Sequence, residues 1–320
     1  MSTDLPAPYL LTVGETMALL TAEHPGPLAH VSSMRLGIGG SESNVAIGVQ
    51  RLGGNAVWCG RTGRDSLGQL VRREIRAEGV TVRITEDPDA PTGLMLKERR
   101  TMSAQKVSYY RAGSAGSRLS PEDLDPSLIS GAAVVHISGI TPALSTSAAT
   151  TIRRTIEIAR SEGVTISLDL NYRANLWTAT EAGRAYRELI PLTDIVFAGD
   201  EEAALAVGPA DDPVHLAQRI ADLGPSQAII KLGSKGAVAC IDGKLLHQSA
   251  VPIEPVDTVG AGDAFVAGYL AELMAGKHPG ERLELAAKTG AFACLASGDW
   301  EGLPTRAELA LLHQNEPVTR

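Results

Sequence analysis

The sequence predicts an α/β fold in which a mostly parallel, doubly wound sheet carries helices on both faces, with a small β-sheet appended. Three observations lead to this prediction. Short apolar segments alternate with helical segments along most of the chain, which is typical of parallel strands covered by helices. Glycines follow several of the helical segments, where helices commonly stop. Two stretches, 31–37 and 92–111, contain strand-like segments with few helical signals between them.

The elements follow one another in a regular order. The helix at 145–162 is the clearest, because Ser145 can cap it and Gly163 can stop it. In the appended sheet, residues 107–111 alternate like a strand with one face in water. The expected strands are 9–13, 56–60, 132–137, 164–168, 194–197 and 228–231. The expected helices are 41–52, 66–78, 145–162, 181–190, 213–223 and 261–274.

Composition places the chain among ordinary globular proteins. It has 320 residues, 44% hydrophobic and 21% charged, which is enough to bury a large core. The net charge of −8 argues against nucleic acid or an anionic membrane as a main partner. Cys59, Cys240 and Cys294 have neither zinc-type nor redox-type spacing, so we expect a cytoplasmic protein. Residues 1–9 lack an apolar signal core, and no apolar run approaches the roughly 20 residues of a membrane helix.

The strongest chemical signal is Asp-Thr-Val-Gly-Ala-Gly-Asp-Ala-Phe at residues 257–265. Gly260 and Gly262 allow the backbone to approach a ligand closely, and the helix that follows has no charge from 264 to 271, so it should be buried. Its N-terminus then offers free N–H groups and a positive dipole end, which suit phosphate. Asp263 is a lone carboxylate at this point. It is either a base that takes a hydroxyl proton or only a helix cap.

A second signal is the glycine cluster Gly-Ile-Gly-Gly at residues 37–40, which opens the helix at 41–52. It is not a dinucleotide fingerprint, because the G-x-G-x-x-G spacing is missing, and a dehydrogenase is therefore disfavoured. No Walker A lysine motif occurs in the chain. The glycines either approach a ligand or serve tight helix packing.

Together, the helix Gly-Gly-x-x-x-Asn-Val-Ala at 39–46 and the segment at 257–265 resemble the two signatures of the ribokinase-like (PfkB) carbohydrate kinases. The resemblance spans residues 13 to about 303. It implies a single ribokinase-like domain over 1–320, with lid segments at about 14–37 and 92–112. It also implies phosphorylation of a sugar hydroxyl by ATP with Mg²⁺. Asp263 matches the base, and Gly260, Ala261 and Gly262 match the anion hole. Residues implied to lie along the nucleotide are Asn171, Lys231, Gly233, Ser234 and Gly236.

One segment departs from the family pattern. After the strand at 194–197 the family usually has Asn-Glu-x-Glu, whereas this chain has Gly199-Asp-Glu-Glu202. Glu202 keeps the second acid, which the resemblance associates indirectly with Mg²⁺ and phosphate, but Gly199 lacks the amide. Alternatively, the three acids are only a first helical turn that the dipole favours. The resemblance also implies a monovalent cation such as K⁺ near Asp257.

Two further segments bear on the substrate. Tyr109–Ala115 lies in the lid, and 169–177 follows the strand at 164–168, at the strand end where such sheets bind ligands. Arg111 and Arg173 could hold a carboxylate in fork geometry, although a surface salt bridge explains each one alone. The segments resemble the 2-keto-3-deoxygluconate kinase subgroup. That resemblance implies substrate contacts from Gly39, Gly40, Asn44, Tyr110, Arg111, Arg173, Asp263 and Asp299.

These observations predict a kinase that phosphorylates 2-keto-3-deoxygluconate to the 6-phosphate. A neutral-sugar kinase of the same family, such as a fructokinase or ribokinase, is the nearest alternative. A sugar-binding sensor without activity is an alternative of another class, which the intact Asp263 motif disfavours. We also expect a homo-oligomer that pairs through the lid sheet. His136, near a strand end, is expected to be a packed core residue.

Overall fold

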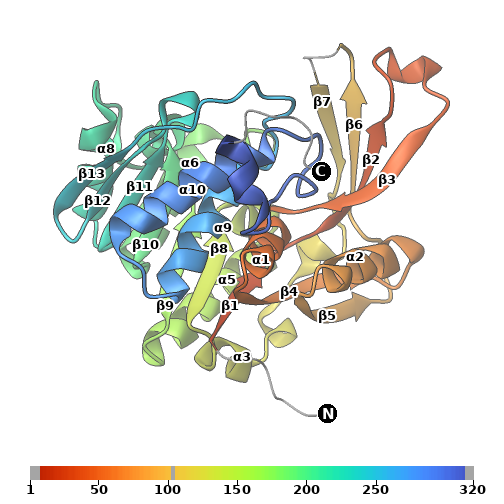
Figure 1. The fold of residues 1–320 in the computed structure, drawn as a ribbon. Coiled ribbons are helices and arrows are strands. Elements are labelled where there is room, and N and C mark those ends of the chain that lie inside the picture. Colours follow the sequence, from red (N-terminus) through yellow and green to blue (C-terminus); the bar gives the residue numbers. More distant parts are fainter. Residues whose placement is uncertain (1–7, 102–104, 314–320) are drawn as a thin grey trace.

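The computed structural model describes residues 8–101 and 105–313, and these residues adopt the expected doubly wound α/β fold (Figure 1). Residues 1–7, residues 102–104 of the second lid segment and residues 314–320 lie outside the described part of the chain. Neighbouring strands from β5 to β11 are parallel, and β12 and β13 extend the sheet in the antiparallel sense. In spatial order, the main sheet of the described residues comprises β13 (Lys244–Gln248), β12 (Ala237–Ile241), β11 (Gln227–Lys231), β10 (Ile195–Gly199), β9 (Thr165–Asp169), β8 (Val134–Ser138), β1 (Tyr9–Val13), β4 (Asn55–Gly63) and β5 (Thr81–Asp87).

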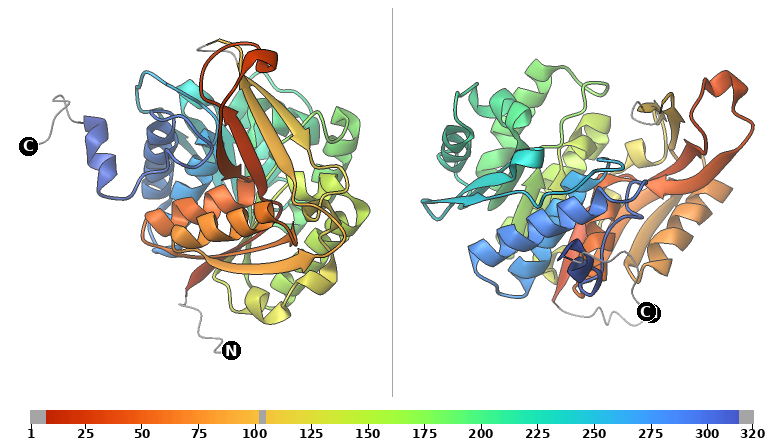
Figure 2. Two further views of the ribbon diagram at one scale, coloured as in Figure 1. Left: turned by 90° about the vertical axis from the view of Figure 1, so that its right-hand side faces the viewer. Right: turned by 45° about the horizontal axis from the view of Figure 1, so that its top comes forward.

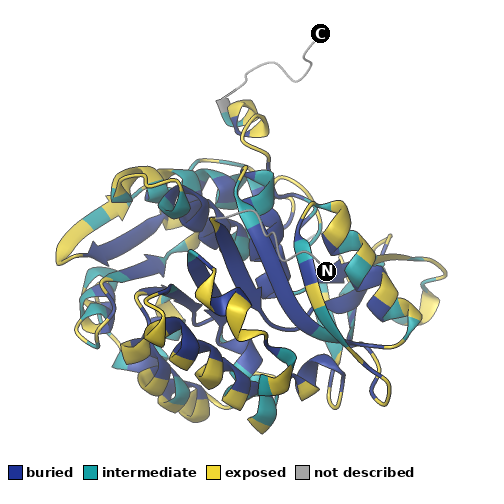
Figure 3. Ribbon diagram, turned by 90° about the horizontal axis from the view of Figure 1, so that it is seen from below, coloured by how far each residue is buried: buried dark blue, intermediate teal, exposed yellow. Residues whose placement is uncertain are grey.

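Helices cover both faces of this sheet, and a separate apolar core lies under each layer. Figure 3 shows buried strands enclosed by helices whose outer faces are exposed. The first layer comprises α1 (Ser41–Arg51), α2 (Ser66–Ala77), α9 (Ala261–Met274) and α10 (Pro279–Ala293). The second comprises α3 (Pro126–Ser130), α5 (Thr146–Ser161), α6 (Ala179–Leu189), α7 (Asp200–Val207) and α8 (Pro213–Ala221), and the short α4 (Ile140–Leu144) follows β8.

Every strand and helix predicted from the sequence is present, with ends that differ by no more than three residues. Ser145 caps α5 by accepting a hydrogen bond from the backbone N–H of Ala148, and Gly163 has the positive φ of 69° that favours a glycine after a helix. The hairpin of β12 and β13 was not predicted. Its turn is Asp242-Gly243, with φ of 49° and 74°, a sequence signal for such a hairpin.

The second sheet is small and separate, and it stands to one side of the main sheet (Figure 2). Its described strands, in spatial order, are β3 (Met34–Gly39), β2 (Met17–Ala22), β6 (Leu94–Arg99) and β7 (Gln105–Tyr110). The register gives it two distinct faces, because successive side chains of a strand point to opposite sides. The inner face carries Leu19, Met95, Lys97, Val107 and Tyr109. The outer face carries Leu20, Leu36, Leu94, Leu96 and Tyr110.

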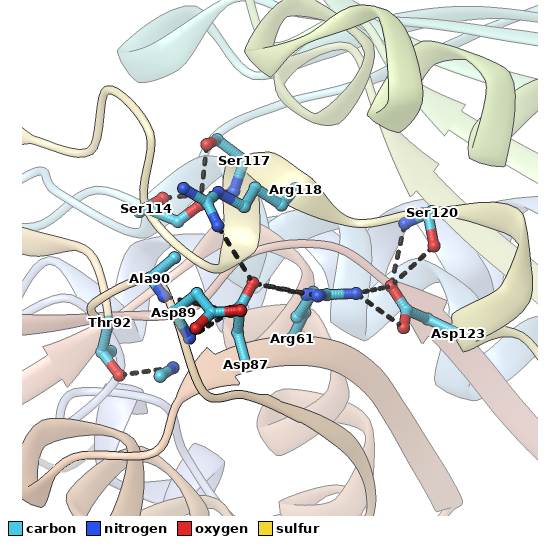
Figure 4. A network of polar contacts seen from close by, with 11 residues as sticks. Arg61, Asp87, Asp89, Ala90, Thr92, Ser114, Ser117, Arg118, Ser120 and Asp123 are labelled. Atoms are coloured by element: carbon cyan, nitrogen blue, oxygen red, sulfur yellow. Dashed lines mark hydrogen bonds and ion pairs between the residues drawn. The ribbon is translucent and has the colours of Figure 1, made fainter.

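A polar network fixes the chain where it passes from the main sheet into the second sheet, which we call the lid (Figure 4). The guanidinium of Arg61, on β4, lies 2.9 Å from the Asp87 carboxylate at the end of β5 and 3.1 Å from Asp123. Asp87 also accepts hydrogen bonds from the backbone of Asp89 and Ala90. Because β6 begins shortly afterwards, this network sets the position from which the lid strand starts.

Other predictions concern single residues. His136 is fully buried, with Nδ1 3.0 Å from the Ser167 hydroxyl, and burial lowers its pKa to about 3, so it is the core histidine expected. Cys59, Cys240 and Cys294 are buried and free. Among the described residues, no helix has the length and apolar character needed to cross a membrane.

Candidate active site

Helix α9 starts at the edge of the main sheet where the parallel strands end. Gly260, just before it, has a φ of 78°, and a Cβ there would overlap the carbonyl oxygen of Asp299, so this position requires glycine. The helix is buried from Ala264 to Glu272. The first N–H groups of a helix have no partner one turn back, and they form the positive end of its dipole. Such a helix start can hold the negative charge of a phosphoryl group.

The carboxylate of Asp263 lies at this helix start, and residues of α1 hold it in place. Ser41 Oγ donates to Oδ1 at 2.8 Å, and Asn44 Nδ2 donates to Oδ2 at 2.8 Å. The Asn171 amide, just after β9, in turn donates to Ser41 Oγ at 2.7 Å. Burial raises the pKa of Asp263, and the hydrogen bonds from Asn44 and Ser41 oppose this effect. The carboxylate is therefore fixed in direction and more basic than an ordinary aspartate, which suits removal of a hydroxyl proton.

A cavity of about 360 Å³ lies in front of Asp263. Its walls come from the carboxyl ends of β9, β10 and β11, the start of α9, the inner face of the lid and the loop after α10. Ligands of open α/β sheets bind at this edge. The predicted site residues that line the cavity are Asn171, Arg173, Glu202, Lys231, Gly260, Gly262, Asp263 and Asp299.

Lys231, at the end of β11, places a fixed positive charge beside the anion-binding helix start. Its Nζ lies 2.8 and 2.7 Å from the two carboxylate oxygens of Asp169. Burial alone lowers the pKa of Lys231, but the carboxylates of Asp169 and Glu202 outweigh it and raise the pKa above its ordinary value. The lysine is therefore protonated. A Cβ added to Gly262 would lie 3.6 Å from Nζ, so the ammonium and the helix dipole act on the same space.

Glu202 lies in the first turn of α7, and it also lines the cavity. Its carboxylate accepts hydrogen bonds from the backbone N–H of Gly199 at 2.7 Å and of Tyr172 at 3.0 Å. At Gly199, a Cβ would meet Glu202 only at 3.6 Å, so a side chain has room there. No group of three or more His, Cys, Asp or Glu residues in the described part of the chain could hold a metal ion.

Arg173 brings a second cation to the cavity. It is half-buried, and its Nη1 donates to the carbonyl oxygen of Tyr172 at 3.0 Å. Its positive charge lowers the pKa of Asp263 and so opposes the effect of burial, which means that the two side chains lie close enough to interact electrostatically. Among the described residues, it forms no salt bridge with a carboxylate. Its charge is available to a ligand.

The lid contributes other side chains than those predicted. Because β7 alternates between faces, Tyr109 lines the cavity, and Tyr110 is 63% exposed on the outer face. Arg111 is buried against Glu15, with Nε 2.8 Å and Nη2 2.6 Å from Oε2. The structure therefore places Tyr109, and not the predicted Tyr110, on the cavity side, and it turns Arg111 toward Glu15 rather than into the cavity. Strand register puts Tyr109 in that place, and Arg111 already has its own carboxylate.

Three predicted substrate residues lie just behind the cavity wall. A Cβ on Gly39 would crowd the Asp299 carboxylate, and one on Gly40 would crowd the backbone of Glu15. These two glycines allow close packing, which was the alternative considered for them. Asn44 is buried and reaches Asp263. Within the described structure these three residues act on the site through their neighbours.

The remaining nucleotide-site predictions lie in the loop that follows Lys231. Gly233 and Gly236 have φ of 56° and 91°, which explains glycine at both positions, and Ser234 is exposed. The loop is next to the cavity in sequence but does not line it. A role in nucleotide binding stays a prediction for these three residues.

Asp299 closes the cavity from the loop after α10. Burial raises its pKa to about 6, although the nearby ammonium of Lys97 lowers it. Arg51 fixes this loop, because its Nη1 donates to the carbonyl oxygen of Leu303 at 2.6 Å and its guanidinium lies 5.3 Å from the ring centroid of Trp300. The acid is therefore held opposite the start of α9.

Sequence reasoning missed Ser41, Lys97 and Tyr109. Ser41 and Asn44 are three residues apart on one helix, so the helical spacing could have paired them. Lys97 and Tyr109 belong to lid strands, and their inward direction depends on a register that no local signal fixes.

Comparison with known proteins identifies the family of this chain. The model of the pfkB family of carbohydrate kinases matches residues 7–306. The 2-dehydro-3-deoxygluconokinase of Bacillus subtilis is 36% identical over 307 residues, which cover 94% of each chain. The crystal structure of 2-dehydro-3-deoxygluconokinase from Thermotoga maritima is similar with a TM-score of 0.88 and 26% identity, over 95% of this chain and 98% of that one. A protein of Escherichia coli described as a ribokinase, solved with ATP and Mg²⁺, has the same fold, with a TM-score of 0.88 at 24% identity over 95% and 98% of the two chains. The chain belongs to the PfkB family of carbohydrate kinases.

Proposed function

We propose that this member of the family transfers the γ-phosphoryl group of ATP to 2-keto-3-deoxygluconate and forms the 6-phosphate. The observation that carries the proposal is one cavity that holds both Asp263, at the start of α9, and the guanidinium of Arg173, which forms no salt bridge with any residue that the structure describes. The first group suits phosphoryl transfer to a hydroxyl, and the second suits an acidic sugar. The names of the relatives from Bacillus subtilis and Thermotoga maritima support the same substrate.

In this proposal Asp263 is the general base. Ser41 and Asn44 hold its two oxygens from behind, so that the carboxylate can accept the proton of the terminal sugar hydroxyl. The raised pKa of Asp263 makes it a better proton acceptor once it is ionised. The attacking oxygen then bonds to the phosphorus atom, the bond to the β-phosphate oxygen breaks, and ADP leaves.

The start of α9 and Lys231 stabilise the negative charge of the transferred group. In this proposal the N–H groups of Gly262 and Asp263 face it, and the ammonium of Lys231 lies beside them, whereas the N–H of Ala261 donates to the carbonyl oxygen of Thr258 at 3.4 Å. Mg²⁺ bound to the triphosphate neutralises its charge. We propose that it arrives with the nucleotide and that Glu202 acts on it indirectly, because the cavity offers scattered carboxylates rather than a cage.

Arg173 is proposed to bind the carboxylate of the sugar acid. A guanidinium can donate two parallel hydrogen bonds to a carboxylate, and Arg173 already stands half-buried at a strand end. Tyr109 and Met95, from the lid, and Asp299, from the loop after α10, would enclose the rest of the sugar. A lid in this position also keeps water from the phosphoryl group.

The outer face of the lid supports a proposal about assembly. Leu36 is 49% exposed and Tyr110 is 63% exposed, and both lie on that face with other leucines. We propose that two copies pair through it, in the cytoplasm, where free cysteines stay reduced. The molar masses of the wild type and Leu36→Glu, measured by light scattering, test this proposal. Equal molar masses of the two proteins would contradict it.

The substrate proposal is tested by steady-state kinetics with ATP on four sugars, namely 2-keto-3-deoxygluconate, its galactonate epimer, fructose and ribose. We expect the highest kcat/KM on one of the two acid sugars, and phosphate on its terminal hydroxyl by NMR. A higher kcat/KM on fructose or ribose would assign the chain to the neutral-sugar kinases of the family instead.

A further inference from the structure

Lys97 is a buried lysine on the inner face of the lid. Its side chain, on β6, is 3% exposed. Its Nζ lies 3.1 Å from Oδ2 of Asp257 and 3.5 Å from Oδ1 of Asp299. These acids stand on either side of the anion-binding helix start: Asp257 begins the turn that leads to it, and the carbonyl of Asp299 packs on Gly260. A single lid cation therefore touches both segments that form this part of the site.

Both carboxylate oxygens of Asp257 have partners within the chain. Oδ1 accepts a hydrogen bond from the backbone N–H of Val259 at 3.1 Å, and Oδ2 accepts one from Lys97. Burial raises the pKa of Asp257, but the Val259 hydrogen bond and the charge of Lys97 outweigh it, and the pKa ends below its ordinary value. Asp257 is an ionised carboxylate whose charge the lid lysine already compensates.

The family resemblance suggested a monovalent cation near Asp257, and the residues present do not fit one. A bare K⁺ needs several free oxygen ligands, whereas the carboxylate oxygen that could face it is taken by an ammonium. A cavity of about 240 Å³ adjoins Asp257, and Lys97, Arg35 and Arg99 line it, against Asp257 and Glu23. Three positive side chains disfavour a further cation in that space.

We propose that the ammonium of Lys97 takes the place of a monovalent cation in this chain and fastens the lid strand β6 to the loop that carries the anion-binding helix start. Two consequences follow. Activity of the wild type does not depend on K⁺. The position of the lid also sets the geometry around the phosphoryl group, because the charge that holds the turn before α9 belongs to a lid strand. Lys97 is a positioning residue for the kinase activity on which this inference rests.

The first test varies the cation and needs no variant. Turnover of the wild type is measured with KCl, NaCl and choline chloride at equal ionic strength, on whichever sugar it phosphorylates. We expect rates in the three salts that agree within about twofold, which is less than one charge-assisted hydrogen bond is worth. Activation of the wild type by K⁺ of roughly tenfold or more would overturn the proposal.

The second test uses Lys97→Met, with Lys106→Met as the matched control, because Lys106 is an exposed lysine of the neighbouring lid strand. In choline chloride, Lys97→Met should lose at least about tenfold in kcat. K⁺ or methylammonium should restore part of the loss, which a merely structural role does not predict. Lys106→Met should show no loss and no rescue. Full kcat of Lys97→Met in choline chloride would refute the proposal.

A third measurement does not depend on any sugar. Once Lys97 is removed, Asp257 and Asp299 form a buried acidic pair open to a cation, so KCl should raise the Tm of Lys97→Met above its value in choline chloride. The wild type should show no such difference. Equal Tm values of the variant in both salts would contradict the proposal, even if the substrate assignment were wrong. If Lys97→Met does not fold, Lys97→Arg replaces it, and a K⁺ requirement in that variant would overturn the proposal.

Discussion

Replacing Arg173 by methionine separates an acid-sugar kinase from its neutral-sugar relatives. Methionine keeps most of the length of the side chain and removes the charge. In the structure, Arg173 makes one hydrogen bond to the carbonyl of Tyr172 and no salt bridge among the described residues. Stability should therefore change little, because no buried carboxylate loses its partner.

The expected loss can be worked from the bond that the substrate would lose. Hydrogen bonds to charged groups contribute about 1.5–3 kcal/mol, which corresponds to roughly 10- to 150-fold in kcat/KM for 2-keto-3-deoxygluconate. The kcat/KM for fructose, if any is measurable, should stay within about twofold. Arg173 also opposes the raised pKa of Asp263, so the acid limb of the pH–rate profile should move to higher pH in Arg173→Met.

Arg111→Met is the matched control for this prediction. Arg111 belongs to a buried pair, and breaking such a pair typically costs about 3–5 kcal/mol because Glu15 is left uncompensated. We expect a lower Tm for this variant and an unchanged ratio of acid-sugar to neutral-sugar kcat/KM. The reasoning is refuted if Arg173→Met keeps wild-type kcat/KM on the acid sugar, or if Arg111→Met alone changes the ratio.

Three other predictions concern the start of α9 and the residues around it. Gly262→Ala should fold normally, because its Cβ meets only Lys231 Nζ at 3.6 Å. By calorimetry, the variant should lose more affinity for ATP than for the sugar, relative to the wild type. Equal losses of both affinities would indicate a general distortion of the site. Gly260→Ala should lower the Tm strongly, because its Cβ would overlap Asp299 and its φ is positive; a normal Tm would contradict the close approach. Burial raises the pKa of Asp299 to about 6, so the folded protein binds a proton at this residue more tightly than the unfolded protein does. The free energy of unfolding should therefore decline as pH rises from about 4 to 6. Urea titrations at several pH values should show a smaller decline of the free energy of unfolding in Asp299→Asn. An identical decline in the variant and the wild type would rule out Asp299 as its source.

Most of the fold could be predicted from the sequence, because the signals that mark the helices and strands are local. The bounds of α9 follow from Gly260 before it, Gly262 in its first turn and its charge-free run, and the structure has them at the predicted residues. Ser145 and Gly163 likewise mark the ends of α5 through contacts within a few residues. Such local signals do not depend on where the rest of the chain lies.

The site was predicted less completely, because its details depend on contacts between distant segments. Arg111 pairs with Glu15, 96 residues away, and nothing near either residue indicates the partner. The choice between Tyr109 and Tyr110 depends on strand register, in which a shift of one residue reverses every side chain. Lys97 and Asp257 are 160 residues apart. By contrast, Asp263 was identified because its motif and its buried helix are contiguous.

The kinetics of Asp263→Asn test the central claim most directly. The variant should fold, because Asn44 can turn its amide to accept a hydrogen bond from the new side chain, and a buried charge is removed. We predict that kcat with ATP and 2-keto-3-deoxygluconate falls by about 10²–10⁴, with KM values close to those of the wild type, because a positioned base is lost while binding groups remain. A folded variant that turns over at nearly the wild-type rate would contradict the assignment of Asp263 as the base.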